Sequence, residues 1–202
     1  MKRSSIFFVP FLVLAFAVPL RAEIIPISQI SDFLNELKTA NGSFTQINPD
    51  GTISTGKIYI KRPGRMRFDY DPPDPALVIA GGGAVAIFDR KSNEPPQQFP
   101  LKRTPLSVIL ERNVDLADAN MITDHRADEL TTTITAQDPE NPDIGFIELV
   151  FTDTPIELRQ WVITDQDGAQ TTVILGDMEF GAPLKANLFS AQIEIQKTIA
   201  RD

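Results

Sequence analysis

The chain has 202 residues, a length typical of one domain, and a formal net charge of −8. An acidic protein is repelled by nucleic acids and by anionic membrane surfaces, so the charge argues against partners of either kind. The chain has no cysteine, which excludes disulfide bonds and lipidation on a cysteine, and its one histidine excludes a zinc site built from several histidines.

The N-terminal segment is typical of a secretory signal peptide. Two basic residues precede an apolar run from Ile6 to Leu20, and Ala22 is a suitable residue before the cleavage site. A transmembrane anchor is the alternative, but the run is shorter than the roughly 20 residues of a span and contains two prolines. We therefore predict a signal peptide at residues 1–22 and a soluble, exported domain at residues 23–202, with no membrane anchor.

A helix is predicted at the start of the mature chain. Apolar residues recur at helical spacing from Ile27 to Leu37, with polar residues between them. Ser28 and Ser31 are candidate N-caps, and Asn41-Gly42 is the expected end.

Most of the remaining chain is predicted to form strands. Turn signals at 48–51, 81–83 and 165–168 separate alternating apolar segments. A second short helix is expected at 104–112, with Pro105 in its first turn. The predicted strands lie at 44–47, 57–61, 65–70, 77–80, 85–89, 129–136, 145–152, 157–165 and 169–180.

This pattern favours one large antiparallel sheet, which is expected to curl. Several strands have apolar residues on both faces, as in the segment 146–151. The helices are few and short, so part of an apolar concave face is expected to remain for a ligand.

An ordered set of motifs resembles the LolA family of outer-membrane lipoprotein carriers. The resemblance covers most of residues 27–190. The motifs are Ser43-Phe44-Thr45-Gln46, the segment from Gly56 to Gly64 with Lys61-Arg62-Pro63, Met66-Arg67-Phe68-Asp69-Tyr70 with Pro73, Thr104-Pro105-Leu106, and the hairpin from Leu158 to Gly168. The chain departs from the family pattern at Gly81-Gly82-Gly83, at Ala86 and at Phe68, and these positions affect the expected shape of the cavity.

The resemblance implies a mainly β fold with some α-helix. The expected architecture is a single large curved antiparallel sheet, a half-open, incomplete β-barrel, with short helices forming a lid over an apolar cavity. It also implies a periplasmic chaperone of a Gram-negative bacterium that shields the acyl chains of lipoproteins. The implied partners are acylated lipoproteins, an inner-membrane ABC transporter that releases them and an outer-membrane acceptor, with the carrier itself a monomer. The acceptor shares the fold but needs a cysteine after its signal, so the absence of cysteine favours the carrier.

Candidate site residues follow from the apolar pattern and from the resemblance. Arg62 is expected at the cavity mouth, where the family's arginine closes the lid and assists cargo transfer. Its guanidinium offers five donors for helix-end carbonyls, whereas the alternative is a strand-end arginine in solvent. The candidate acyl-chain lining, for which plain core packing is the alternative, is Met66, Phe68, Tyr70, Val78, Val85, Ile109, Leu110 and Phe151.

The sequence offers few residues in arrangements typical of catalysis, so we predict neither an enzyme nor a cofactor or metal site. His125 is expected in an acidic surface loop, without a cysteine or a G-x-S-x-G nucleophile to partner it. Asp69, Asp71 and Asp74 are expected to be solvated loop carboxylates rather than an acid-base pair. A related half-barrel that binds another lipid or senses lipoproteins remains the first alternative, and an esterase or glycosidase remains the second.

Overall fold

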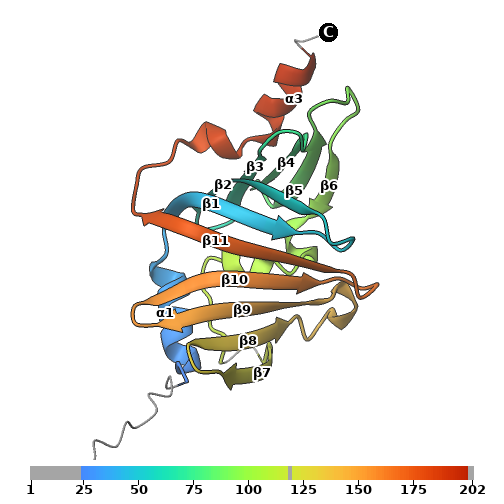
Figure 1. Ribbon diagram of the computed structural model, residues 1–202. Helices are drawn as coiled ribbons and strands as arrows, with labels where there is room; N and C mark the ends of the chain where they lie inside the picture. The colour runs from blue at the N-terminus through green and yellow to red at the C-terminus, as the bar shows by residue number, and fades with distance from the viewer. Residues whose placement is uncertain (1–23, 118–119, 200–202) are drawn as a thin grey trace, which may run out of the picture.

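The computed structural model describes residues 24–117 and 120–199, and the predicted signal peptide at residues 1–22 lies outside this range. The fold is mainly β, with one antiparallel sheet of eleven strands that does not close into a barrel (Figure 1). The strands are β1 (Thr39–Ile47), β2 (Ile53–Lys61), β3 (Arg65–Tyr70), β4 (Ala76–Gly81), β5 (Ala84–Asp89), β6 (Gln97–Pro100), β7 (Ile122–Ala127), β8 (Thr131–Gln137), β9 (Phe146–Asp153), β10 (Ile156–Thr164) and β11 (Gln170–Phe180).

Two meanders make up the sheet. Strands β1 to β6 lie side by side in chain order, as do β7 to β11, and β1 pairs with β11 to join the two sets. This junction pairs Ala40 with Phe180 and has a register shift between Gly42 and Phe44. A Cβ on Gly42 would collide with the carbonyl oxygen of Asp177 on β11, so the close approach of these strands requires glycine here.

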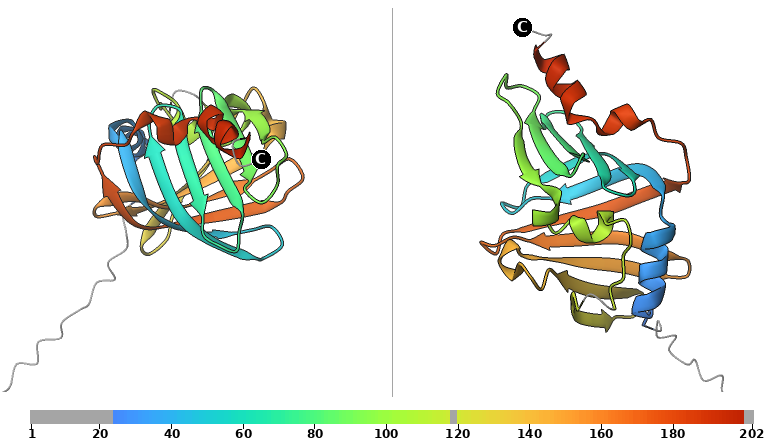
Figure 2. Two further views of the ribbon diagram at one scale, coloured as in Figure 1. Left: turned by 90° about the horizontal axis from the view of Figure 1, so that it is seen from above. Right: turned by 180° about the vertical axis from the view of Figure 1, so that it is seen from behind.

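Within the described residues, three α-helices and three 3₁₀ turns accompany the sheet. Figure 2 shows α1 (Ile27–Glu36) and α2 (Ser107–Leu110) on one side of the curved sheet, whereas α3 (Ala191–Ile199) lies at the end near the C-terminus. Side chains of α3 pack on the face of β4 and β5 opposite to the one that α1 and α2 cover. The 3₁₀ turns are η1 (Leu101–Arg103), η2 (Pro142–Ile144) and η3 (Ala186–Phe189).

The predicted hairpin turns are confirmed. Gly82 and Gly83 connect β4 to β5 with φ angles of 62° and 82°, the left-handed conformation that a two-residue turn of this kind requires. The segments 48–51 and 165–168 likewise connect β1 to β2 and β10 to β11. Nine strands were expected, and the structure adds the edge strands β6 and β7.

The predicted ends of the first helix are wrong. The helix begins after Pro26 with no side-chain cap, and Ser31 instead accepts a hydrogen bond from the amide of Leu116. It ends at Glu36, because Leu37 is already extended and Asn41-Gly42 lies within β1. Pairing with the neighbouring strands outweighs the turn preference of Asn-Gly at this position.

The second predicted helix is shorter than expected, and the C-terminal helix was missed. Only Ser107–Leu110 is α-helical within 104–112, after the 3₁₀ turn η1. Part of the apolar stripe of α3 packs on the sheet through Ala191 and Ile195, while Ile199 remains exposed. A helix with so narrow an apolar face gives a weak periodic signal.

Candidate functional site

The concave face of the sheet is covered by an apolar inner cluster that also includes residues of α1 and α2. Alternation along β3 directs Met66, Phe68 and Tyr70 into this cluster, as predicted. Ile147, Leu149 and Phe151 on β9 are fully buried in it. All eight candidate lining residues belong to the cluster or pack against it, Val78 being the one that is only partly buried. The structure thus brings together every apolar side chain proposed from the sequence.

Aromatic rings at right angles dominate the middle of the inner cluster. Phe44 contacts Phe68 and Tyr70 edge to face, each with ring centroids 5.1 Å apart, and Phe68 contacts Trp161 at 6.2 Å. On the lid side, Phe33 of α1 meets Phe151 of β9 at 5.8 Å. Phe33, Phe44 and Trp161 were not among the predicted lining residues. The alternation that points Phe68 inward does the same for its neighbours and could have identified Phe44 and Trp161.

Tyr70 ends the aromatic group with a polar atom. Its hydroxyl donates a hydrogen bond of 2.7 Å to the side-chain oxygen of Gln46. Burial, together with the charge of Asp74, raises the pKa of Tyr70 to about 12, against a smaller opposing effect of this hydrogen bond. The phenol therefore stays neutral at physiological pH, and the ring contributes apolar surface up to the rim of the cluster.

Arg62 lies where the end of α2 meets the sheet. Its side chain is 8% exposed, and its Nη2 donates a hydrogen bond to the carbonyl oxygen of Glu111, directly after α2. The amide of the adjacent Gly64 donates to the carbonyl oxygen of Leu110 at 2.8 Å. Burial lowers the pKa of Arg62 from its ordinary value, and Nε of Arg62 has no hydrogen-bond partner among the described residues. The solvent-exposed alternative for Arg62 is therefore wrong.

The segment 111–116, which we call the strap, follows α2 in the chain and is hydrogen-bonded to side chains of α1. The side chain of Asn35 donates to the carbonyl oxygen of Val114 at 2.8 Å and accepts from its amide at 2.9 Å. Ser31 accepts from the amide of Leu116 at 3.2 Å. Because α1, the strap and α2 are tied to one another, they form one continuous cover. Sequence reasoning missed Asn35, because a single asparagine on a helix gives no sign of its distant partner.

Hollows lie around the rim of the inner cluster. A side groove of about 620 Å³ is bounded by β5, β6, the start of the α2 segment and the loops after β8 and β10. A smaller hollow of about 400 Å³ lies between the end of α1 and the end of β11, beside Phe33 and Phe180. The inner cluster itself consists of buried side chains from the sheet, α1 and α2.

The convex face has a smaller outer cluster, which is formed by Leu77, Ile79, Ala86 and Phe88 under Ala191 and Ile195 of α3. Arg67 is buried beside it and pairs with Asp69 at 2.7 Å and with Glu194 at 3.2 Å. Arg67 also donates to the carbonyl oxygen of Leu188 at 3.0 Å, and Arg90 pairs with Asp69. The ion pair of Arg67 with Glu194 and its hydrogen bond to Leu188 therefore fasten the C-terminal segment to the outside of the sheet.

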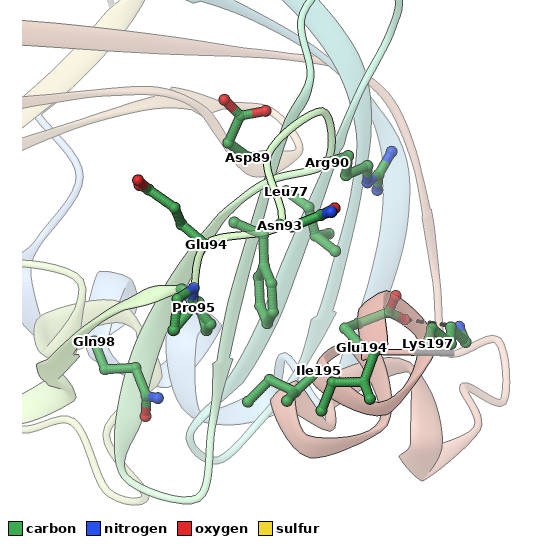
Figure 3. Close-up of a pocket in the computed structure, with 13 residues that line it drawn as sticks. Leu77, Asp89, Arg90, Asn93, Glu94, Pro95, Gln98, Glu194, Ile195 and Lys197 are labelled. Atoms are coloured by element: carbon green, nitrogen blue, oxygen red, sulfur yellow. Dashed lines mark hydrogen bonds and ion pairs between the residues drawn. The ribbon is translucent and has the colours of Figure 1, made fainter. Parts of the chain in front are cut away.

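An outer pocket of about 200 Å³ opens beside α3 (Figure 3). Its apolar floor includes Leu77 and Ile195, and charged side chains such as Arg90, Glu194 and Lys197 stand around it. Glu194 bonds Lys197 at 2.8 Å and also Arg67, so the charges at this rim are engaged with one another.

The polar residues weighed for catalysis take structural roles. His125 lies in strand β7 rather than in a loop, half-buried, with Nε2 2.9 Å from the carbonyl oxygen of Ile25. Asp69 lies in β3 and pairs with arginines, so its expected place in a solvated loop is wrong. Asp71 and Asp74 do lie in the turn after β3, where they accept hydrogen bonds from Thr55 and Ser54.

Within residues 24–117 and 120–199, no group of three or more His, Cys, Asp or Glu side chains is arranged to hold a metal ion. In the same part of the chain, no helix has both the length and the apolar character needed to cross a membrane.

Comparison with known proteins identifies the family. Residues 35–192 match the family described as "Outer membrane lipoprotein carrier protein LolA". Proteins named outer-membrane lipoprotein carrier protein are similar, with 26% identity in Methylococcus capsulatus (84% of this chain and 84% of that protein) and 27% in Dechloromonas aromatica (85% and 86%). A putative outer membrane lipoprotein-sorting protein domain from Vibrio parahaemolyticus has the same fold, with a TM-score of 0.50, 10% identity and coverage of 83% of this chain and 96% of that chain. The chain therefore belongs to the LolA family of outer-membrane lipoprotein carrier proteins.

Proposed function

We propose that this protein is a periplasmic carrier that shields the acyl chains of lipoproteins between an inner-membrane ABC transporter and an outer-membrane acceptor. The observation that carries the proposal is a large apolar cluster whose cover is tied down at its edges by polar contacts, notably those of Arg62 and Asn35. Membership of a family of carriers supports it, and no catalytic step is assigned to any residue.

The physics of the task matches such an interior. Each methylene group of an acyl chain costs about 0.8 kcal/mol when it is left in water. Leaving two or three long acyl chains in water would therefore cost on the order of tens of kcal/mol, and the apolar surface of a carrier has to offset this cost. The inner cluster offers apolar side chains that now contact α1 and α2, and an acyl chain would take the place of that cover.

Closure of the empty protein then competes with cargo. The contacts of Arg62 and Gly64 with the end of α2 stabilise the closed state, in which the interior is filled by the protein's own side chains. A ligand that binds the open state must overcome this closing energy, and the same energy helps to expel it at the acceptor. We assign Arg62 to lid closure and cargo transfer, and the eight predicted apolar residues to the acyl-chain lining.

The first test is to purify the tagged protein gently from the periplasm of its own host and analyse it by native mass spectrometry. Acylated lipoproteins bound one to one to a monomer would support the carrier. Free phospholipid without lipoprotein would instead favour a binder of another lipid. A protein that stays empty under several mild conditions would contradict the proposed cavity.

The second test is the Arg62→Leu variant, with Arg65→Leu as its control because Arg65 is exposed on the same turn. We expect Arg62→Leu to fold, to load cargo and to fail in unloading, since the empty closed state loses its contact with Glu111. Arg62→Lys keeps the charge without the planar fork and should be intermediate. Normal delivery by Arg62→Leu would rule out the role assigned to this residue.

A further inference from the structure

One row of apolar side chains crosses the concave face from one exposed end to another. Cross-strand partners in register give the row Phe99, Val85, Ala80, Met66, Ile60, Ala40 and Phe180. Residues that face each other in neighbouring strands point to the same side of a sheet, so the whole row faces the interior. Its five inner members are at most 4% exposed, whereas Phe99 is 45% and Phe180 is 47% exposed.

A second row runs beside the first toward the same edge of the sheet. It contains Ile58, Phe68, Val78 and Ile87 in register, and it ends with Ile87 at 39% exposure. Both rows thus leave the buried cluster at β5 and β6. There Ile87 and Phe99 line the side groove together with Pro100, Pro105 and Ile144.

The side groove is separate from the contacts that close the lid. It reaches the α2 segment at Pro105, before the helix, whereas Arg62 and Gly64 hold the carbonyl groups of Leu110 and Glu111 at the other end. An apolar ligand can therefore lie in the groove while the lid remains closed.

We propose that the side groove is the docking site for the first alkyl chain of an acylated ligand, which then advances along the two rows as the lid opens. The inference rests on the proposed carrier function and assigns its entry point. The occupant is a flexible hydrocarbon chain because Ile87 and Phe99, which line the groove, are the ends of the two apolar rows, although Arg103, Thr104 and the segment 165–167 also line it. The first row crosses six strand spacings and is therefore about 29 Å long. One acyl chain spans half the hydrocarbon thickness of a bilayer, roughly 15 Å, so the row is longer than the chain.

Phe180 marks the competing entrance and provides a matched control. It has the same side chain as Phe99 and nearly the same exposure, and it ends the same row. Its hollow is the smaller of the two and is reached by one of the two apolar rows rather than both, whereas charged residues line both hollows.

The test uses p-benzoylphenylalanine in place of Phe99, Phe180 or, as an interior control, Phe68. Each protein is illuminated with a synthetic hexapeptide that starts with a dipalmitoylated S-glyceryl-cysteine, at short times after mixing and again at equilibrium. We expect cross-links at position 99 first and at position 68 later, with position 180 at least about tenfold weaker at short times. Cross-links at 68 and 180 without any at 99 would overturn the entry point and leave the carrier function standing. No cross-link at 68 and no binding of the lipopeptide would contradict the carrier function itself.

A rate measurement provides an independent check. The double variant Ile87→Asn with Phe99→Ser removes apolar surface from the groove and leaves the buried part of both rows intact. We expect the association rate of the same lipopeptide to fall about tenfold, on the scale of lost apolar contact for two large side chains. Ile53→Asn, at an exposed position on the β1–β2 hairpin, should leave the rate unchanged. An unchanged rate for the double variant would also overturn the proposal.

Discussion

The two faces of the sheet are covered in different ways. On the concave face, α1, the strap and α2 lie over a large apolar cluster, and side-chain to backbone hydrogen bonds of Arg62, Asn35 and Ser31 hold them in place. On the convex face, the C-terminal segment lies over a small cluster and is held by the ion pair of Arg67 with Glu194 and by the hydrogen bond from Arg67 to Leu188. Apolar contacts accept any apolar replacement, whereas buried ion pairs require particular partners. The inner cover is therefore suited to exchange with a ligand, and the outer one to permanent attachment.

The largest expected effect comes from deleting an inner aromatic ring. Phe151→Ala, at a fully buried position, should lower the free energy of unfolding by about 4 kcal/mol, whereas Phe88→Ala beside the outer pocket should cost about 2 kcal/mol. Urea unfolding followed by the fluorescence of Trp161, the single tryptophan, measures both. Equal losses would show that the two clusters contribute alike and would remove the contrast between the faces.

Loss of Arg67 tests the ion pairs on the convex face. Arg67→Met leaves the carboxylates of Asp69 and Glu194 without this partner, and we expect a cost of about 2–3 kcal/mol together with faster amide hydrogen exchange in α3. Arg126→Met is the control, since that side chain pairs at an exposed position and should cost less than about 0.5 kcal/mol. Unchanged exchange in α3 would contradict an anchoring role for Arg67.

Asn35 offers a way to loosen the inner cover alone. Asn35→Leu removes both hydrogen bonds to Val114, so local opening of the strap should become easier by about 1–1.5 kcal/mol. The amide of Val114 should then exchange about tenfold faster, while exchange in α3 stays the same. Asn41→Leu is the matched control, because Asn41 bonds Glu179 at an exposed site. Exchange at Val114 that matches the unmodified protein would show that other contacts hold the strap.

The smallest effect is expected from acid. Burial alone would raise the pKa of Asp69, but this pKa lies below its ordinary value of 3.8, because the hydrogen bonds and charges of Arg67 and Arg90 outweigh the effect of burial. Burial likewise opposes the shift at Glu194, whose pKa lies below its ordinary value of 4.5, because Lys197 and Arg67 outweigh the effect of burial. A lowered pKa contributes stability above the unfolded-state value, and this contribution is lost as the pH falls through the folded-state value.

Contacts of α3 should therefore weaken only as the pH falls below about 5, because both folded-state pKa values lie below the ordinary ones. The contacts of Arg62 and Asn35 involve no carboxyl group and should persist over this range. Amide chemical shifts in α3 and in the strap, recorded in one titration, compare the two directly. Loss of the strap contacts before those of α3 would reverse the comparison.

Sequence reasoning predicted the sheet well because local signals determine it. Alternation in β3 and β9 identified which side chains face inward, and the motif Gly81-Gly82-Gly83 fixed a hairpin. Contacts between distant segments were not predictable in this way. The pairing of Asn35 with Val114 and of Arg67 with Glu194 depends on where the chain returns after many residues, and nothing next to these residues indicates it. Arg62 was found only because its motif resembles that of a known family.

The junction between β1 and β11 has a consequence for biogenesis. Every other strand pair joins neighbours in the sequence and can form as soon as its hairpin has been synthesised. The pairing of Ala40 with Phe180 must await nearly the whole chain. Until then the apolar concave faces of the two meanders remain unprotected in water, and an incomplete molecule is prone to aggregate. Completion of the sheet thus depends on the late arrival of its last strand.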